Sequence, residues 1–105
     1  MVEKLYLYES TNPAKKYMLK FINPETDRIK TVHFGASAYD DYTSFPKAER
    51  DERKARYLNR HKKEDWTDPH RASTLSRYIL WNLPTIGASI RDMNKIFGIK
   101  IIKKF

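Results

Sequence analysis

The chain has 105 residues, of which 40% are hydrophobic and 13% aromatic, and its 21 Lys and Arg outnumber 13 Asp and Glu for a net charge of +8. This length predicts a single domain, residues 1–105, and the lack of cysteine excludes a disulfide scaffold and a Cys-ligated zinc finger. The positive balance favours polyanionic partners, namely nucleic acid, acidic membrane or acidic protein surfaces. No apolar run approaches the ~20 residues of a membrane span, and the N-terminus is unlike a signal peptide. We therefore expect an intracellular protein without a membrane span.

The first half of the sequence has the pattern of β-strands. Within residues 14–35, two alternating runs rich in aromatic and β-branched residues flank a turn over residues 23–28, which predicts a β-hairpin. The alternation places three large side chains on one face: Tyr17, Leu19 and Phe21. Residues 5–8 predict a further strand at the edge of the sheet.

The second half has the pattern of helices. Residues 47–63 follow Pro46 and contain no glycine, proline or β-branched residue, which predicts a basic helix. Its apolar stripe is thin, so we expect it to lie on the surface; the stripe consists of Ala48, Ala55 and Leu58.

Two further helices are expected around Pro84. Residues 73–83 and 85–97 predict a helical hairpin, with Ser73 and Thr85 as the capping residues. The second of these helices carries five apolar residues at helical spacing: Ile86, Ile90, Met93, Ile96 and Phe97. Gly98 is expected to end it, and residues 99–105 form either a last strand or a basic tail.

These elements together predict an α+β fold. A β-hairpin, either alone or extended by terminal strands into a three- to four-stranded antiparallel sheet, packs against three helices. Trp81 is expected in the core. Trp66 either joins the first helix to the second or faces outward as an interface anchor.

The basic helix supplies the main candidate site. Its cations and one tyrosine recur every three or four residues and so share one face: Arg50, Arg53, Lys54, Tyr57 and Arg60. Such a face suits phosphate contacts, with Tyr57 available for stacking, and Lys100, Lys103 and Lys104 extend the prediction to the C-terminus. The alternative is a merely solvated helix, because acidic residues within it can pair with the cations.

Catalytic signatures are sparse. His33 follows a strand and His61 lies on the basic helix, an outline compatible with a metal-dependent nuclease, and these are the candidate ligands for that alternative. No His pair has the i, i+4 spacing, so the sequence by itself predicts no metal and no cofactor. The turn at Leu83-Pro84 bears some likeness to a helix-turn-helix, but an ordinary helical hairpin is favoured.

Several short motifs occur along the chain: Val32-His33-Phe34-Gly35, Tyr39-x-Asp41-Tyr42-Thr43, Arg53-Lys54-x-x-Tyr57-Leu58-x-Arg60-His61, Asp65-Trp66-x-Asp68-Pro69, Leu75-Ser76-Arg77 and Leu80-Trp81-x-x-Pro84. Their combination resembles a small uncharacterised family encoded mainly by large DNA viruses of eukaryotes, of the mimivirus and chlorella-virus kind. The resemblance implies a viral protein in the infected cell or the virion, and it supplies no catalytic residue.

Three functions follow from these features. The first is a virion- or replication-associated protein that binds nucleic acid, DNA in preference, through sequence-independent phosphate contacts. The second is a minor capsid or core protein whose basic face meets acidic viral protein, and the third is the nuclease. The balance favours a non-enzymatic protein, and the oligomeric state stays open.

Overall fold

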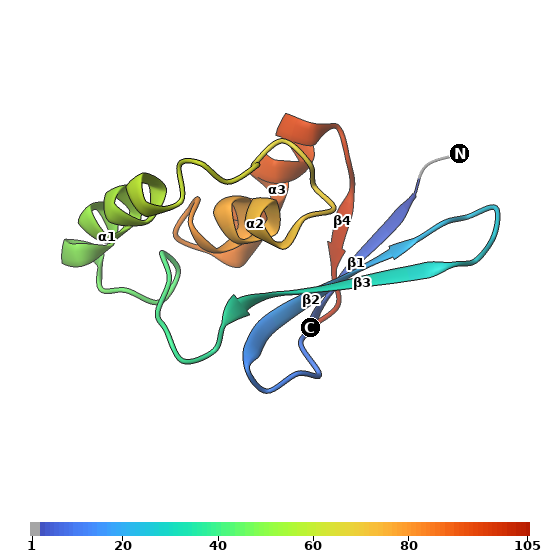
Figure 1. The fold of residues 1–105 in the computed structure, drawn as a ribbon, viewed down its shortest axis with the longest axis horizontal. Coiled ribbons are helices and arrows are strands. Elements are labelled where there is room, and N and C mark those ends of the chain that lie inside the picture. Colours follow the sequence, from blue (N-terminus) through green and yellow to red (C-terminus); the bar gives the residue numbers. More distant parts are fainter. Residues whose placement is uncertain (1–2) are drawn as a thin grey trace.

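Four strands form one open sheet, with the last two helices over one of its faces and the first helix beyond one end of the strands (Figure 1). The computed structural model describes residues 3–105, and the strands are β1 (Lys4–Glu9), β2 (Lys15–Ile22), β3 (Ile29–Ala36) and β4 (Ile101–Lys103). The predicted hairpin is confirmed as β2 and β3, with Tyr17 opposite Phe34 and Ile22 opposite Ile29. The α+β class is likewise confirmed.

The order of the strands corrects two details. The order is β3-β2-β1-β4, so β1 is an inner strand and not the predicted edge. The alternative of a final strand for residues 99–105 is confirmed by β4, but β4 runs parallel to β1, so the sheet is mixed and not purely antiparallel. A parallel neighbour needs a long crossover connection, and here the helices between β1 and β4 supply it.

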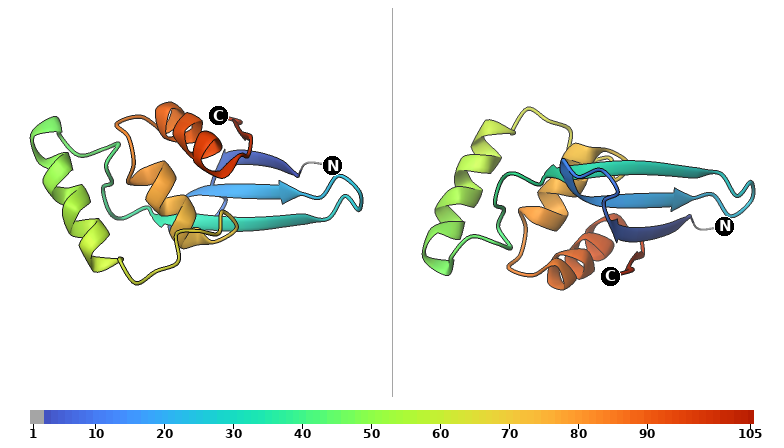
Figure 2. Two further views of the ribbon diagram at one scale, coloured as in Figure 1. Left: turned by 90° about the horizontal axis from the view of Figure 1, so that it is seen from above. Right: turned by 90° about the horizontal axis from the view of Figure 1, so that it is seen from below.

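Alternation along the strands separates a buried face from an open one. Leu5 and Leu7 of β1 are almost fully buried, and so are Leu19 and Phe21 of β2. These side chains meet the helices in one hydrophobic core, which also contains Phe34, Leu75, Ile79, Leu80, Ile90, Met93 and Ile101. Strand residues of the opposite parity lie on the face that no helix covers (Figure 2, right).

The helices are α1 (Lys47–Arg60), α2 (Ala72–Leu75), which continues into a π-helical segment η1 (Ser76–Leu80), and α3 (Ile86–Phe97). The three predicted helices therefore exist, but α1 ends before residue 63 and the second ends at Leu80 instead of residue 83.

The caps are partly as predicted. Thr85 caps α3, because its hydroxyl oxygen accepts a hydrogen bond from the Ala88 amide, and Gly98 ends this helix at a left-handed φ of 63°. The predicted cap at Ser73 is wrong. Its hydroxyl donates to the Asp65 carbonyl and so secures the preceding loop.

Two apolar stripes also differ from their predictions. In α3, Ile90 and Met93 are buried, but Ile96 is 53% exposed. In α1, Ala48 and Ala55 are exposed and Tyr57 is the buried residue. The helix therefore approaches the rest of the protein with its aromatic and basic face, because its alanines bury too little apolar area to compete with a tyrosine ring.

Both tryptophans are half-buried. Trp81 packs against the core from its margin and stacks on Tyr57, with ring centroids 4.5 Å apart and planes 5° apart. Trp66 lies against the second helix, since the Arg77 guanidinium is 5.6 Å from its ring centroid. Trp66 is therefore in contact with the second helix, and its packing against the first helix stays a prediction.

Candidate nucleic-acid interface

The predicted face of α1 points toward the protein. Tyr57 is 6% exposed, and its ring contacts Trp81 on η1's C-terminal side and His61 with centroids 4.4 Å apart. Burial raises the pKa of Tyr57 to about 12. A ring already packed between protein aromatics is unavailable for stacking on a base, so Tyr57 serves to attach α1.

The cations of the same face are also engaged. The Lys54 Nζ donates to the Asn82 carbonyl at 2.8 Å and lies 5.0 Å from the ring centroid of Tyr42, and burial lowers the pKa of Lys54. Arg50 lies over the same Tyr42 ring at 5.7 Å. Arg53 lies over a phenylalanine ring and forms a 3.7 Å ion pair with Glu49. The residue spacing correctly predicts that these side chains share one face of α1. In the structure, this face packs against the rest of the protein.

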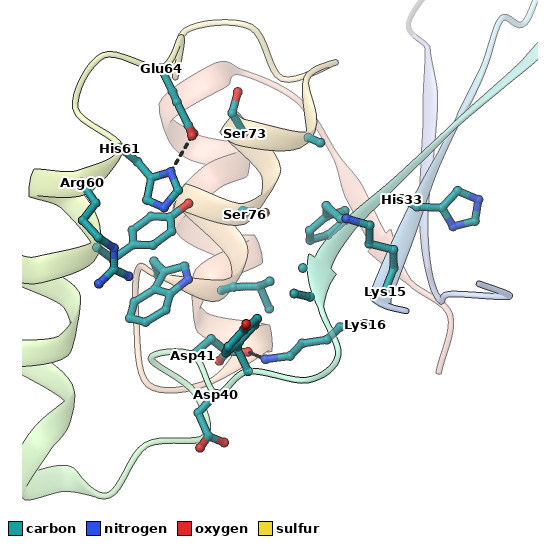
Figure 3. Close-up of a pocket in the computed structure, with 18 residues that line it drawn as sticks. Lys15, Lys16, His33, Asp40, Asp41, Arg60, His61, Glu64, Ser73 and Ser76 are labelled. Atoms are coloured by element: carbon teal, nitrogen blue, oxygen red, sulfur yellow. Dashed lines mark hydrogen bonds and ion pairs between the residues drawn. The ribbon is translucent and has the colours of Figure 1, made fainter. Parts of the chain in front are cut away.

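A cleft of about 450 Å³ separates the end of α1 from the strand ends and the second helix (Figure 3). Arg60 and His61 line its α1 side, and Ser73 and Ser76 line the side of the second helix. Arg60 is the one cation of the predicted α1 face that lines this cleft. It is exposed, and among residues 3–105 it forms no ion pair with a carboxylate. Polar and charged groups therefore surround an open space of small-molecule size.

One ion pair inside the cleft is structural. Asp41 is 3% exposed, and its Oδ2 accepts from the Lys16 Nζ at 2.5 Å. Its Oδ1 accepts from the backbone amide of Thr43, so the same carboxylate ties the loop before α1 to β2. The sequence analysis did not single out Lys16, and the 25 residues between the partners leave no local spacing that could have revealed the pair.

The two candidate metal ligands are not brought together. The Nδ1 of His33 is 2.7 Å from the Ser10 hydroxyl, and its ring points away from the cleft (Figure 3). His61 instead pairs with Glu64, through Nδ1 and Oε1 at 2.5 Å. Across residues 3–105 no group of three or more His, Asp or Glu side chains is placed to hold a metal ion.

The C-terminal lysines lie next to β1, because β4 pairs with that strand. The Lys104 Nζ is 4.7 Å from the ring centroid of Tyr6, and the Lys103 Nζ is 4.8 Å from that of Phe105. Lys100 precedes β4 and is exposed. Lys104 therefore lies beside Tyr6 on the uncovered side of the sheet, whereas Lys103 is level with the buried Leu7 and belongs to the helix-covered side.

The uncovered side of the sheet, here called the open sheet face, combines lysines with tyrosines. It comprises these residues of the strand parity opposite to the buried leucines: Lys4, Tyr6, Tyr8, Lys20, Ile22, Ile29, Thr31 and Ile102, with Lys104 following β4. Met18 and His33 share this parity, but they contact the loop after β1 and are not counted in the face. The Lys20 Nζ lies 5.2 Å from the ring centroid of Tyr8. The strands contribute no Asp or Glu to this face. The alternation of Leu and Tyr over residues 5–8 could have predicted that the tyrosines share this face, but the sequence-based prediction did not use it.

Most lysines and arginines among residues 3–105 form no ion pair with a carboxylate. Among residues 3–105, the lysines and arginines that form ion pairs are Lys16, Arg53, Arg56 and Arg71. The remaining cations, including those of the open sheet face, have no such partner in the part of the chain that the structure describes. This protein therefore presents a strongly positive surface that its own acids do not neutralise.

Residues 5–61, more than half of the chain, match a family described as a family of unknown function (DUF5754). The chain belongs to this family. The DUF5754 match takes in β1, β2, β3 and α1, and ends before the second helix. It therefore includes most of the open sheet face and the α1 residues that attach this helix, but not their partners Trp81 and Asn82.

Membership of DUF5754 assigns no activity. No curated protein and no solved structure matches the chain. In the range 3–105, no helix is both long enough and apolar enough to cross a membrane.

Proposed function

We propose that this protein binds nucleic acid through sequence-independent contacts to phosphate. The observation that carries the proposal is the set of lysines and arginines without carboxylate partners, in a chain of net charge +8. Cations that are not neutralised within the protein are free to replace the counterions around phosphates, and the release of those counterions drives non-specific binding.

The open sheet face is the most suitable place for these contacts. Lys4 lies on β1, Lys20 on β2 and Lys104 directly after β4, so three adjacent strands contribute a lysine without an intervening acid. Arginines of α1 are less suitable, because that helix also carries Glu49 and Glu52, which already form ion pairs with Arg53 and Arg56. Lysine is a flexible point charge that binds phosphate without a fixed geometry, which is consistent with sequence-independent binding.

Oligonucleotide binding measured by fluorescence anisotropy over a salt series tests the proposal. Affinity should fall log-linearly with salt, with a slope of about −0.7 per phosphate contact for a single strand and about −0.9 for duplex DNA. Oligonucleotides of different sequence should give the same affinity. Failure to bind any of them at about 50 mM salt would overturn the proposal and favour an acidic protein surface as the partner.

We further propose that this binding serves a virus, as a virion- or replication-associated activity on DNA. The support is the motif resemblance to the family of large DNA viruses, together with the unpaired positive charge described above. Quantitative mass spectrometry of purified particles tests the virion role. Recovery with the genome after the shell is removed would support it, and recovery with the shell would favour a capsid protein instead.

A further inference from the structure

The open sheet face holds two tyrosines that the phosphate contacts leave unexplained. Tyr6 and Tyr8 lie on the same side of β1, two residues apart and therefore separated by about 6.7 Å along the strand. Both are half-buried, so their rings are supported by the sheet while one side remains accessible. The corresponding positions Leu5 and Leu7 on the other side are buried in the core, which fixes the direction of the tyrosines.

Cations flank this tyrosine pair on both sides. Because β1 lies between β2 and β4, Lys20 approaches Tyr8 from one neighbouring strand and Lys104 approaches Tyr6 from the other. Lysine–tyrosine contacts at exposed positions are weak, and base–aromatic stacking is stronger. A lysine can therefore leave the ring for a phosphate while a base takes its place on the ring.

The rest of the face fits an unpaired strand. Ile102 is 39% exposed and lies opposite Tyr6 on β4, and Ile29 is 58% exposed on β3, so apolar surface for the faces of bases is available on both sides of β1. At one end the loop after β1 closes the face, since Ser10 bonds His33 and the Thr11 hydroxyl is 3.9 Å from the Met18 sulfur. The part of the open sheet face that is accessible to a ligand is thus limited to the central strands and the hairpin end of the sheet.

We propose that the open sheet face binds single-stranded nucleic acid, with bases stacked on Tyr6 and Tyr8 and phosphates contacted by Lys20 and Lys104. Bases in a duplex are stacked on one another and do not present their faces to a protein, so such a platform selects unpaired strands. This inference rests on the proposed function and adds the class of nucleic acid and the residues that recognise it.

The test compares single-stranded and duplex oligonucleotides of equal length with two double variants. Tyr6→Leu with Tyr8→Leu removes both rings and should weaken single-strand binding by about tenfold or more, while duplex binding changes little. Tyr6→Phe with Tyr8→Phe keeps the rings and should bind like the wild type. The matched control is Tyr39→Leu, because Tyr39 is 74% exposed but lies at the cleft and not on the open sheet face.

A titration of the wild-type protein gives an answer that does not depend on how a variant folds. Addition of a short oligothymidylate should shift the NMR ring resonances of Tyr6 and Tyr8 and leave those of Tyr57 and Trp81 in place. Shifts confined to Tyr57, Trp81 or the cleft would overturn the inference.

The outcomes separate the two proposals. Wild-type single-strand affinity in the double-leucine variant, with the steep salt dependence retained, would overturn the stacking platform and leave phosphate binding intact. Absence of any oligonucleotide binding by the wild type would overturn both. Self-association that the double-leucine variant abolishes, without oligonucleotide binding, would identify a second copy of the chain as the occupant and overturn the platform.

Discussion

At the level of single residues, Asp41 has a structural role that no local sequence pattern indicates. Its carboxylate is nearly inaccessible, pairs with Lys16 and accepts hydrogen bonds from both the amide and the hydroxyl of Thr43. A buried ion pair contributes little net stability relative to apolar packing, but the loss of one partner leaves the other charge buried without compensation. The pair therefore fixes the loop that leads into α1.

We expect Asp41→Asn to lower the free energy of unfolding by about 3 kcal/mol, because Lys16 would lose its counter-charge. Urea unfolding followed by circular dichroism measures this change. The control is Glu52→Gln, which breaks a surface ion pair with Arg56 whose side chains are 70% and 57% exposed, and should cost only about 0.3–0.5 kcal/mol. Equal losses in the two variants would show that the Lys16–Asp41 pair is no more than a surface contact.

Tyr57 makes the folding stability of the protein depend on pH in the alkaline range. Its folded-state pKa of about 12 lies above the ordinary value of 10.0, chiefly because the ring is buried, so the folded state retains the proton longer than the unfolded state. Below pH about 10 both states are protonated and the residue adds no pH dependence. Between about 10 and about 12 the unfolded state releases the proton first, so stability falls as pH rises.

The variant Tyr57→Phe should show a smaller fall in stability over this alkaline range than the wild type. A residual fall should remain, because the hydrogen bond from the Tyr42 hydroxyl to Asp51 also raises the pKa of Tyr42. Chemical unfolding repeated at several alkaline pH values measures both. Identical pH profiles in variant and wild type would mean that Tyr57 ionises like a solvent-exposed tyrosine.

At the level of elements, α1 is attached through loops. Its contacts are made to Tyr42 and Phe45 in the loop before it and to Trp81 and Asn82 in the loop after η1. The sheet and α3 instead share the main hydrophobic core. The helix should therefore open locally at a lower free energy than the sheet does.

Trp81→Ala should loosen α1 selectively. Full burial of a tryptophan would predict a cost of ~3–5 kcal/mol, and since Trp81 is only half-buried we expect a value near the lower end of that range. Amide hydrogen exchange should accelerate in residues 47–60 while β1 and β2 remain protected. Uniform acceleration across the sheet would instead place Trp81 within the main core.

The elements also show what the sequence could predict. Local patterns were enough to predict the hairpin, the three helices and the Thr85 cap, because alternation, helix-breaking residues and capping residue types all act between neighbours in the sequence. The parallel pairing of β1 with β4 joins opposite ends of the chain and leaves no local pattern. The inward direction of α1 was missed for a related reason, since its partners Trp81 and Asn82 are more than twenty residues away in sequence.

The candidate site was less predictable than the fold. Spacing correctly grouped the cations of α1 on one face, but it could not show that Tyr42 of the preceding loop and the distant Trp81 occupy that face. Tyr6 and Tyr8 were identifiable in principle, because the leucines that alternate with them mark the opposite side of the strand.

At the scale of the whole molecule, two kinds of surface are separated by the sheet. The last two helices cover one side of the sheet (Figure 2), whereas the opposite side carries lysines and tyrosines with no acid from the strands. A positive field concentrated on an uncovered face attracts polyanions and aligns them with that face. The proposed contact with phosphate follows from this separation more than from any single residue.

The salt dependence of single-strand binding in two charge-matched variants tests the proposed function most directly. One variant combines Lys20→Gln with Lys104→Gln on the open sheet face, and the other combines Arg53→Gln with Arg60→Gln on α1. We predict that the lysine variant lowers the magnitude of the salt slope by about 1.4, the value for two lost phosphate contacts, and that the arginine variant keeps a slope close to the wild type. A reduced slope in the arginine variant alone, or wild-type slopes in both, would contradict binding through the open sheet face.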